Sequence, residues 1–330
     1  MNKNHPEVKF GKTGVLLINL GTPDSTSWWD IRKYLREFLS DRRVIEVNPF
    51  IWQIILNLFI LTFRPSKTAH AYKKIWRKES NESPLLFFTR NQASKLNDKI
   101  GNDKVIVDFA MRYGNPSIKS RLDKLKEQGC ENIVILPLYP QYAGATTATV
   151  CDEVYRSLMK MRWQPSLQII PHYESETTYV DALVNSIEKK IKEINWKPDL
   201  IISSYHGIPK SYFDKGDPYQ CYCQKTTRLI KEQFTKIDVQ TTFQSRFGPQ
   251  EWLTPYTDKT LETLPGKGVQ NLLVICPGFA SDCVETLEEI DIQGRESFLN
   301  NGGKNFDLIP CLNDNSDHIR LFEKLVSKYL

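Results

Sequence analysis

The chain has 330 residues, enough for about two domains of ordinary size. Hydrophobic residues make up 40% of it and charged residues 25%, which is ordinary globular usage and excludes a disordered, collagen-like or coiled-coil chain. The 44 Lys and Arg against 39 Asp and Glu leave a surplus too small to predict a nucleic-acid partner, although it suits an anionic substrate or membrane surface. Seven cysteines, an odd number, and a polar N-terminus without a signal peptide favour reduced thiols and a cytoplasmic location.

The first predicted strand is residues 15–20, an apolar run that ends at Gly21-Thr22-Pro23. A continuous apolar run of this length is typical of a strand buried on both faces, as in a parallel sheet.

Residues 50–63 form the most unusual segment, because only Gln53, Asn57 and Thr62 interrupt its apolar character. Its 14 residues are too few to span a bilayer, which needs about 20. Basic residues stand on both sides, at positions 42, 43, 64 and 67. The segment is therefore either a buried core helix or an exposed apolar lip that contacts a membrane or an apolar substrate.

Three features of the first half recur, in the same order, in the second. Residues 199–205 form another apolar run that ends at His206-Gly207-Ile208-Pro209, and residues 109–114 match residues 243–248. The leucine, glycine and asparagine spacing of residues 122–132 also matches residues 261–271. This order predicts two similar halves with alternating strands and helices, rather than two unrelated α/β halves.

Such alternation predicts a parallel sheet flanked by helices in each half. We expect one domain at residues 1–165, a second at 166–310, and a C-terminal helix within 311–330 that returns to the first domain. Ligands of such sheets bind beyond the carboxyl ends of the strands, so the cleft between the halves is the expected pocket. The dinucleotide and Walker glycine spacings are absent from the sequence, which disfavours nucleotide chemistry.

Ionisable residues follow two apolar runs of the second half. His206 stands directly after a predicted strand, where its imidazole can accept a proton or ligate a metal, or can be only a loop residue. Glu285 and Glu289 are spaced i, i+4 on one face of a predicted helix that Ser281 or Asp282 caps. Carboxylates also suit the dipole of a first helical turn, so this row is either structural or a path for protons and cations.

Arginine and aromatic residues gather at the same predicted edge. Arg112-Tyr113 and Arg246-Phe247 stand at duplicated strand ends, where arginine suits either a carboxylate ligand or an interdomain salt bridge. The aromatic residues Tyr139, Tyr142 and Trp252 would suit a flat apolar ligand or belong to the core.

Four of the thiols are candidates for a metal site. Cys221, Cys223, Cys276 and Cys283 could together hold a metal or an iron–sulfur cluster, but the Cys-x2-Cys spacing of zinc ribbons is absent from the sequence. We interpret them as inert thiols and expect no cofactor to be required.

Several ordered motifs resemble ferrochelatases, most of all the proteobacterial, protoporphyrin-using branch. They are residues 19–23, 136–142 followed by two threonines, 204–209, 216–219, 243–246 and 279–289. The resemblance runs from about residue 14 to the C-terminus. Some members of this family carry C-terminal cysteines that hold a [2Fe-2S] cluster, whereas this chain ends in Ser-Lys-Tyr-Leu. A cluster here would have to use the four thiols named above, an arrangement that we do not favour.

The resemblance implies insertion of Fe²⁺ into protoporphyrin IX, giving protoheme and two protons, in a cleft between two Rossmann-like, chelatase-like domains. It implies that His206 and Glu285 are catalytic and candidate metal ligands, with Glu289 and Asp282 as further carboxylates on the same helix. It also implies that residues 50–63 form a lip over the pocket, in peripheral contact with the inner membrane. The implied substrate-binding residues are Leu20, Arg64, Lys67, Tyr72, Ser83, Arg112, Tyr113, Trp252 and Phe279.

Two other functions stay open. A tetrapyrrole chelatase for cobalt or nickel would look alike at His206 and Glu285, although the apolar lip favours an apolar porphyrin. A heme or porphyrin carrier without turnover needs an axial ligand but no row of carboxylates, so Glu285 and Glu289 count against it.

Overall fold

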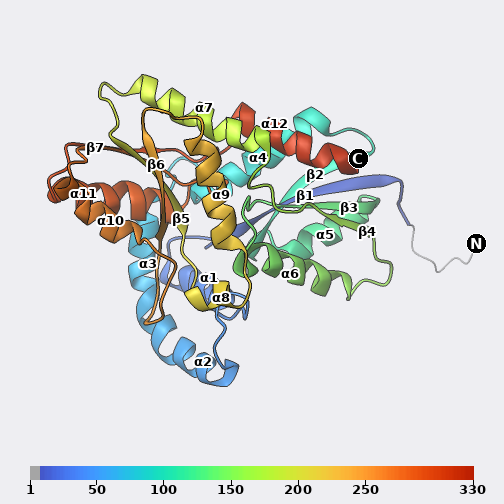
Figure 1. Ribbon diagram of the computed structural model, residues 1–330. Coiled ribbons are helices and arrows are strands. Elements are labelled where there is room, and N and C mark those ends of the chain that lie inside the picture. Colours follow the sequence, from blue (N-terminus) through green and yellow to red (C-terminus); the bar gives the residue numbers. More distant parts are fainter. Residues whose placement is uncertain (1–7) are drawn as a thin grey trace, which may run out of the picture.

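The computed structural model describes residues 8–330, which form two parallel four-stranded sheets flanked by helices (Figure 1). The first sheet has the order β2-β1-β3-β4 and the second the order β6-β5-β7-β8, so the two halves share one topology. The strands are β1 (Lys12–Thr22), β2 (Val105–Gly114), β3 (Cys130–Pro137), β4 (Ser166–Ile169), β5 (Leu200–His206), β6 (Asp238–Gln244), β7 (Asn271–Ile275) and β8 (Asn305–Ile309).

Helices connect these strands and cover the faces of the sheets. The first half contains α1 (Trp28–Leu39), α2 (Pro49–Ile55), α3 (Leu61–Ile75), α4 (Pro84–Ile100), α5 (Ile118–Glu127) and α6 (Thr149–Leu158). The second contains α7 (Thr177–Glu193), α8 (Lys210–Asp214), α9 (Tyr219–Lys231), α10 (Thr257–Thr263), α11 (Arg295–Asn300) and α12 (Ser316–Val326). Three segments are π-helices, η1 (Leu56–Ile60), η2 (Gly144–Ala148) and η4 (Val284–Gly294), and two are 3-10 turns, η3 (Pro265–Lys267) and η5 (Ser327–Tyr329).

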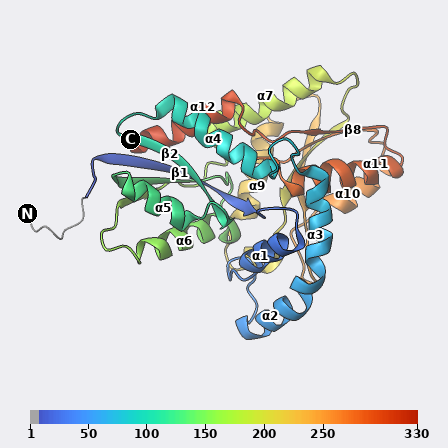
Figure 2. The ribbon, with the colours of Figure 1, turned by 180° about the vertical axis from the view of Figure 1, so that it is seen from behind.

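The expected boundary between the halves needs a correction. Strand β4 pairs with β3 through residues 166–169, so the first sheet extends four residues past position 165. At the other end of the chain, α12 packs against both α4 and α7, as Figures 1 and 2 show. Lys99 of α4 and Glu323 of α12 form an ion pair across this contact.

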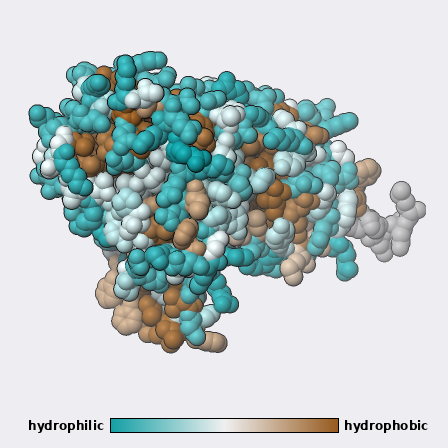
Figure 3. All heavy atoms as spheres, in the orientation of Figure 1, coloured by the Kyte–Doolittle hydropathy of each residue, from teal (hydrophilic) through white to brown (hydrophobic). Residues whose placement is uncertain are grey.

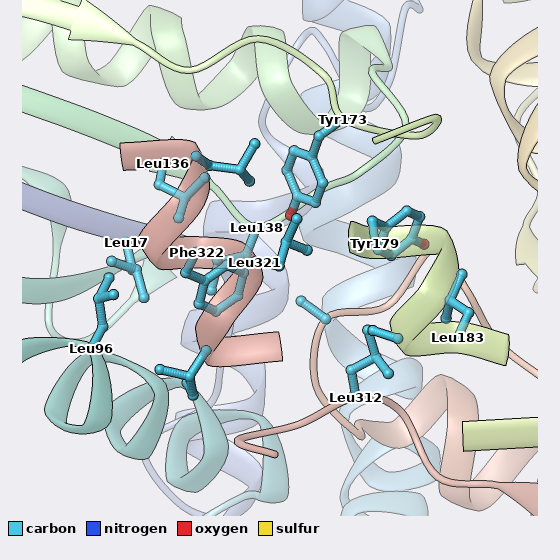
Figure 4. Close-up of a cluster of buried hydrophobic side chains, with 14 of the residues drawn as sticks. Leu17, Leu96, Leu136, Leu138, Tyr173, Tyr179, Leu183, Leu312, Leu321 and Phe322 are labelled. Atoms are coloured by element: carbon cyan, nitrogen blue, oxygen red, sulfur yellow. The ribbon is translucent and has the colours of Figure 1, made fainter. Parts of the chain in front are cut away.

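The largest hydrophobic cluster lies between the two sheets. It combines Leu17 of β1 and Leu96 of α4 with Leu183 of α7 and Phe322 of α12 (Figure 4). Smaller clusters lie on the other face of each sheet. Because both halves contribute to the main cluster, its packing fixes how the two sheets sit relative to each other.

Strand register shows how the halves correspond. Leu16 of β1 lies beside Ile135 of β3, and Ile202 of β5 lies beside Val274 of β7. Four residues further along each strand, Leu20 of β1 corresponds to His206, the last residue of β5.

The predicted match between residues 109–114 and 243–248 is displaced by two residues. Leu17 pairs with Phe109, whereas its counterpart Ser203 pairs with Thr241. The sheet therefore aligns Arg112 with position 244, a glutamine, and not with Arg246 as the sequence echo suggested.

The lip, residues 50–63, is exposed over most of its length. It runs through α2 and η1 into α3 at the bottom of Figure 1, and a brown patch marks its tip in Figure 3. Phe50 is 84% exposed and Phe63 72%, whereas Leu56 and Leu61 are fully buried. Only a few residues, such as Leu56 and Leu61, are buried as a core helix would require, and they anchor the segment. In residues 8–330 no helix combines the length and the apolar character needed to cross a membrane.

Candidate active site

A cavity that is partly open to solvent lies where the carboxyl ends of the two sheets face each other. Among its described lining residues, Glu285 is the one carboxylate and His206 the one imidazole. The rest of the wall is mainly aliphatic and aromatic and includes Leu20, Leu85, Leu138, Ala145, Ile208, Trp252 and Phe279. Such a wall suits a flat, largely apolar ligand.

His206 is the last residue of β5 and is half-buried. Its Nδ1 lies 2.6 Å from the carbonyl oxygen of Gly207. A carbonyl oxygen can only accept, so Nδ1 carries the proton and donates it to this bond. When the ring is neutral, Nε2 therefore carries no hydrogen and can accept a proton or bind a metal.

Glu285 and Glu289 belong to η4, which is a π-helix and not the α-helix that we expected. It begins at Val284, after Cys283, so neither Ser281 nor Asp282 is the cap. The hydroxyl of Thr286 instead accepts a hydrogen bond from the backbone N–H of Cys283, 3.0 Å away. π-Helices are rare and often occur at functional sites.

The end of β6 holds this helix in place. The side-chain amide of Gln244 donates to the carbonyl oxygen of Glu285 at 2.8 Å. The carboxylate of Glu289 accepts from the backbone N–H of Ser245 at 2.7 Å and also from its hydroxyl. Ser245 adopts a positive φ of 64°, a conformation that aims its N–H at the carboxylate.

The environment of Glu289 favours its protonated form. Burial raises the pKa of this carboxyl above its ordinary value. The hydrogen bonds from Ser245 and the charge of His206 oppose the rise, while the charge of Glu285 adds to it. His206 and Glu285, which line the cavity, and Glu289, which does not, thus lie within electrostatic reach of one another, a set that can receive and pass on protons.

Sequence comparisons agree with this geometry. The family model described as ferrochelatase matches residues 12–330. A ferrochelatase of Rhizobium johnstonii is 55% identical, and the alignment covers 99% of this chain and 96% of that protein. Those of Rhizobium meliloti and Brucella ovis are 54% and 51% identical, covering 100% and 99% of this chain and 98% and 94% of their own lengths.

The chain belongs to the ferrochelatase family.

Solved chelatase structures share the fold of this ferrochelatase-family chain. SirB from Bacillus subtilis with Fe3+ aligns with a TM-score of 0.58 and 11% identity, over 96% of this chain and 95% of that one. CbiX, described as the terminal enzyme of siroheme biosynthesis in denitrifying bacteria, aligns with a TM-score of 0.51 and 10% identity, over 97% and 99%. At such identities the likeness shows the fold alone.

Asp282, which the ferrochelatase resemblance placed among the catalytic carboxylates, does not line the cavity. Its side chain is buried and accepts hydrogen bonds from the Asn313 amide at 2.6 Å, the Thr286 hydroxyl at 3.1 Å and the backbone N–H of Cys311 at 3.2 Å. These bonds tie the start of η4 to the segment after β8. In this structure Asp282 therefore holds the start of η4 in position.

Arg112 and Tyr113 are likewise not among the residues that line the cavity. The Arg112 guanidinium lies 2.5 Å from a carboxylate oxygen of Asp41, and the Tyr113 hydroxyl donates to the same oxygen at 2.9 Å. The hydroxyl of Thr149 also donates to Asp41. This buried cluster fixes the chain that leads into the lip.

Two of the implied substrate-binding residues, Arg64 and Lys67, lie on α3, the helix that continues from the lip. Arg64 is on α3, and its guanidinium lies over the ring of Phe247 at 4.4 Å from the ring centroid. Burial lowers the pKa of this guanidinium. Lys67 is exposed almost one turn further along. Arg64 thereby connects the lip of the first half to the loop that follows β6.

Tyr72 and Ser83 line a smaller space beside the cavity, together with Glu285. The pKa of Tyr72 is raised, first by burial and then by the charge of Glu285. Ser83 is the N-cap of α4 and accepts from the backbone N–H of Leu86 at 3.2 Å. Leu20, Trp252 and Phe279, by contrast, are in the wall of the main cavity.

Sequence reasoning missed Gln244 and Ser245 as site residues. Both lie within the residues 243–246 that carried the resemblance, but the arginine of that motif drew the functional interpretation. Arg246 is exposed and pairs with Asp258. The available signal was their position at the end of a strand next to the one that ends in His206.

The four candidate thiols lie in different surroundings. Cys221 is exposed on α9, whereas Cys223, Cys276 and Cys283 are buried in three separate hydrophobic clusters. Burial raises the pKa of each of these three thiols. Throughout residues 8–330, no group of three or more His, Cys, Asp or Glu side chains is arranged to hold a metal ion.

Proposed function

We propose that this protein inserts Fe²⁺ into protoporphyrin IX, as the last chemical step in forming protoheme. The observation that carries the proposal is the pairing of His206, with its Nε2 free, and Glu285 on one wall of an otherwise apolar cavity. Membership of the ferrochelatase family supports the same reaction.

The reaction releases two protons, because the two pyrrole N–H groups of the free porphyrin must lose them as iron enters. His206 accepts a proton at Nε2, and the carboxylate of Glu285 balances the charge that moves through the site. Glu289 is suited to take a proton onward, since its raised pKa favours the protonated form. Fe²⁺ is a substrate here, and His206 and Glu285 are the residues that would guide it.

The macrocycle would lie against the aliphatic and aromatic wall that includes Leu20, Trp252 and Phe279. Its two propionates would pair with Arg64 and Lys67 of α3, which supply positive charge. The apolar wall favours protoporphyrin over a tetrapyrrole with many carboxylates.

Anaerobic incubation of the protein with Fe²⁺ and protoporphyrin IX, followed by absorption spectroscopy, tests the proposal. Conversion of the porphyrin spectrum to that of protoheme over many turnovers is the expected result. Insertion of cobalt or nickel but not iron would favour another chelatase, and a stoichiometric spectral change without turnover would favour a carrier.

We further propose that the lip makes peripheral contact with the cytoplasmic face of the inner membrane. Exposed Ile54, Leu58 and Phe59, with nearby Arg42 and Lys67, form the apolar and basic combination that interfacial segments use. Replacing the three apolar residues by Ser should weaken binding to anionic vesicles and raise the KM for porphyrin. Leu61 is left intact because it is buried.

The matched control for the lip is Met159→Ser, which changes an 80% exposed apolar residue on another surface. Equal vesicle binding by the wild type, the control and the triple variant would contradict the membrane contact.

We also propose that activity requires no iron–sulfur cluster. Protein purified without oxygen should be colourless and contain no stoichiometric inorganic sulfide. A red-brown preparation with bound sulfide would overturn this and direct attention to Cys221 and Cys223.

A further inference from the structure

An ion pair connects the lip helix to the helix that carries the site carboxylates. Lys74 Nζ of α3 lies 2.9 Å from Glu288 Oε1 of η4. The other carboxylate oxygen of Glu288 accepts from the side-chain amide of Gln293 at 2.7 Å. The Glu288 side chain is only 7% exposed, so its charge is satisfied within the protein.

The three carboxylates of η4 have different partners. Glu285 faces the cavity, Glu289 accepts from Ser245 of the second half, and Glu288 reaches Lys74 of the first half. Within residues 8–330, Lys74 is the only lysine or arginine whose nitrogen lies within 4 Å of a carboxylate oxygen of any of the three. The ion pair is therefore the one such contact, among the described residues, on a helix that places three carboxyl groups within five residues.

A π-helix depends on such outside contacts, because its wide turn is rare and less favourable than the α-helical turn. On the β6 side, Gln244 and Ser245 hold η4 through the bonds already described. On the opposite side, α3 supplies the ion pair and the packing of Val284 against its cluster. In both ribbon views α3 runs from the lip toward the helices of the second half (Figures 1 and 2).

We propose that Lys74 is a positioning residue for the reaction: its ion pair with Glu288 holds η4 in the register that presents Glu285 and Glu289 to His206. The expected loss of turnover rests on the proposed function, whereas the positioning of η4 by Lys74 does not. Without the lysine, a nearly buried carboxylate lacks its cation and must move toward solvent or take up a proton. In both cases the attraction that ties η4 to α3 is lost, and with it a contact that holds the helix on which Glu285 and Glu289 lie.

The decisive variants are Lys74→Met, Glu288→Gln and their combination, with Lys74→Arg as the conservative change. Lys73→Met is the matched control, because Lys73 is the exposed neighbour on the same helix. We expect Lys74→Met to lower kcat about tenfold while the KM for protoporphyrin stays within about twofold. Lys74→Arg should recover most of the loss, because it restores the ion pair, whereas the double variant should be no more impaired than Lys74→Met alone, because the pair is already broken.

A second measurement does not depend on turnover. Backbone hydrogen exchange across residues 284–294 should be faster in Lys74→Met than in the wild type, and unchanged in Lys73→Met. Wild-type kcat and exchange in Lys74→Met, or a double variant in which the fold-losses of the two single variants multiply, would overturn the inference. If the wild type itself inserts no iron, the proposed function fails, and the exchange measurement alone still decides whether Lys74 positions η4.

Discussion

The two halves have the same strand order but contribute different chemistry to the cavity. By strand register, Leu20 of the first half corresponds to His206 of the second. In both π-helices, η2 and η4, the residue before the helix and the threonine three positions later form hydrogen bonds with each other. When these two starts are matched, Ala145 corresponds to Glu285. All four residues line the cavity. One half thus provides an apolar wall, and the other provides the imidazole and the carboxylate at the equivalent places.

The loops after β2 and β6 differ in length. The backbone N–H of Met111 bonds to the carbonyl oxygen of Pro116, and that of Phe243 bonds to Pro255 in the same way. Four residues separate the first pair and eleven the second. The longer loop contains Trp252, which lines the cavity and has no counterpart in the first half. The two halves therefore share a scaffold but differ at single positions and in the length of one loop. The strand topology alone does not show where the reactive residues lie.

The largest effect is expected when His206 is given the residue of its counterpart. His206→Leu should lower turnover by roughly 10² to 10⁴, because the cavity loses its proton acceptor while an apolar side chain of similar size preserves packing. Steady-state iron insertion and a melting curve measure this. His70→Leu, at an exposed histidine of α3, is the control. Turnover near that of the control would mean that His206 is peripheral.

The next largest effect is expected at the carboxylate. Glu285→Gln should reduce kcat by about 10- to 100-fold with little change in porphyrin affinity, because the amide fits the same space but cannot balance charge. Fluorescence quenching of protoporphyrin reports affinity independently of turnover. Glu296→Gln, at an exposed acid of α11, controls for loss of negative charge. A change in thermal stability alone would support the helix-dipole role.

A smaller effect is expected at the loop that only the second half has. Trp252→Ala should raise the KM for porphyrin about fivefold to tenfold and leave kcat within about threefold, because it removes an aromatic contact and no reacting group. Steady-state kinetics over a range of porphyrin concentrations separate the two parameters. Trp29→Ala, at a 72% exposed tryptophan of α1, is the control.

The smallest effect concerns Glu289, whose counterpart in the first half is Thr149. A carboxyl with a raised pKa in the folded protein binds its proton more tightly there than in the unfolded chain. Its contribution to stability is present below its ordinary pKa of 4.5 and is lost as pH rises through the folded value. Relative to the wild type, Glu289→Gln should therefore gain free energy of unfolding as pH rises from 4 to 7. Denaturant titrations at several pH values check the sign, and a difference independent of pH would contradict it.

Local pattern was sufficient to predict much of this structure. The apolar runs before Gly21 and Gly207 are strands, and the position of His206 at a strand end follows directly from them. The duplication is confirmed by the shared strand order. For the lip, sequence alone left two alternatives, since an apolar run does not reveal whether other elements cover it.

What the sequence could not predict depends on contacts between distant segments. The partner of Arg112 is Asp41, 71 positions away, and that of Lys74 is Glu288, 214 positions away. The widening of η4 into a π-helix is likewise set by neighbours on both sides and not by local propensity. The two-residue displacement between β2 and β6 arises because strand pairing follows sheet register, whereas the sequence echo follows residue identity.

The shared core also determines how the molecule loses its structure. Leu17 and Leu96 on one side pack in a single cluster with Ile201 and Leu273 on the other, and Phe322 of the last helix belongs to the same cluster. Neither half can therefore open without exposing apolar surface of its partner, so the two behave as one cooperative unit on heating. For the same reason the duplicated halves, although each has a complete sheet, are not separable modules, and the final residues of the chain stabilise its beginning.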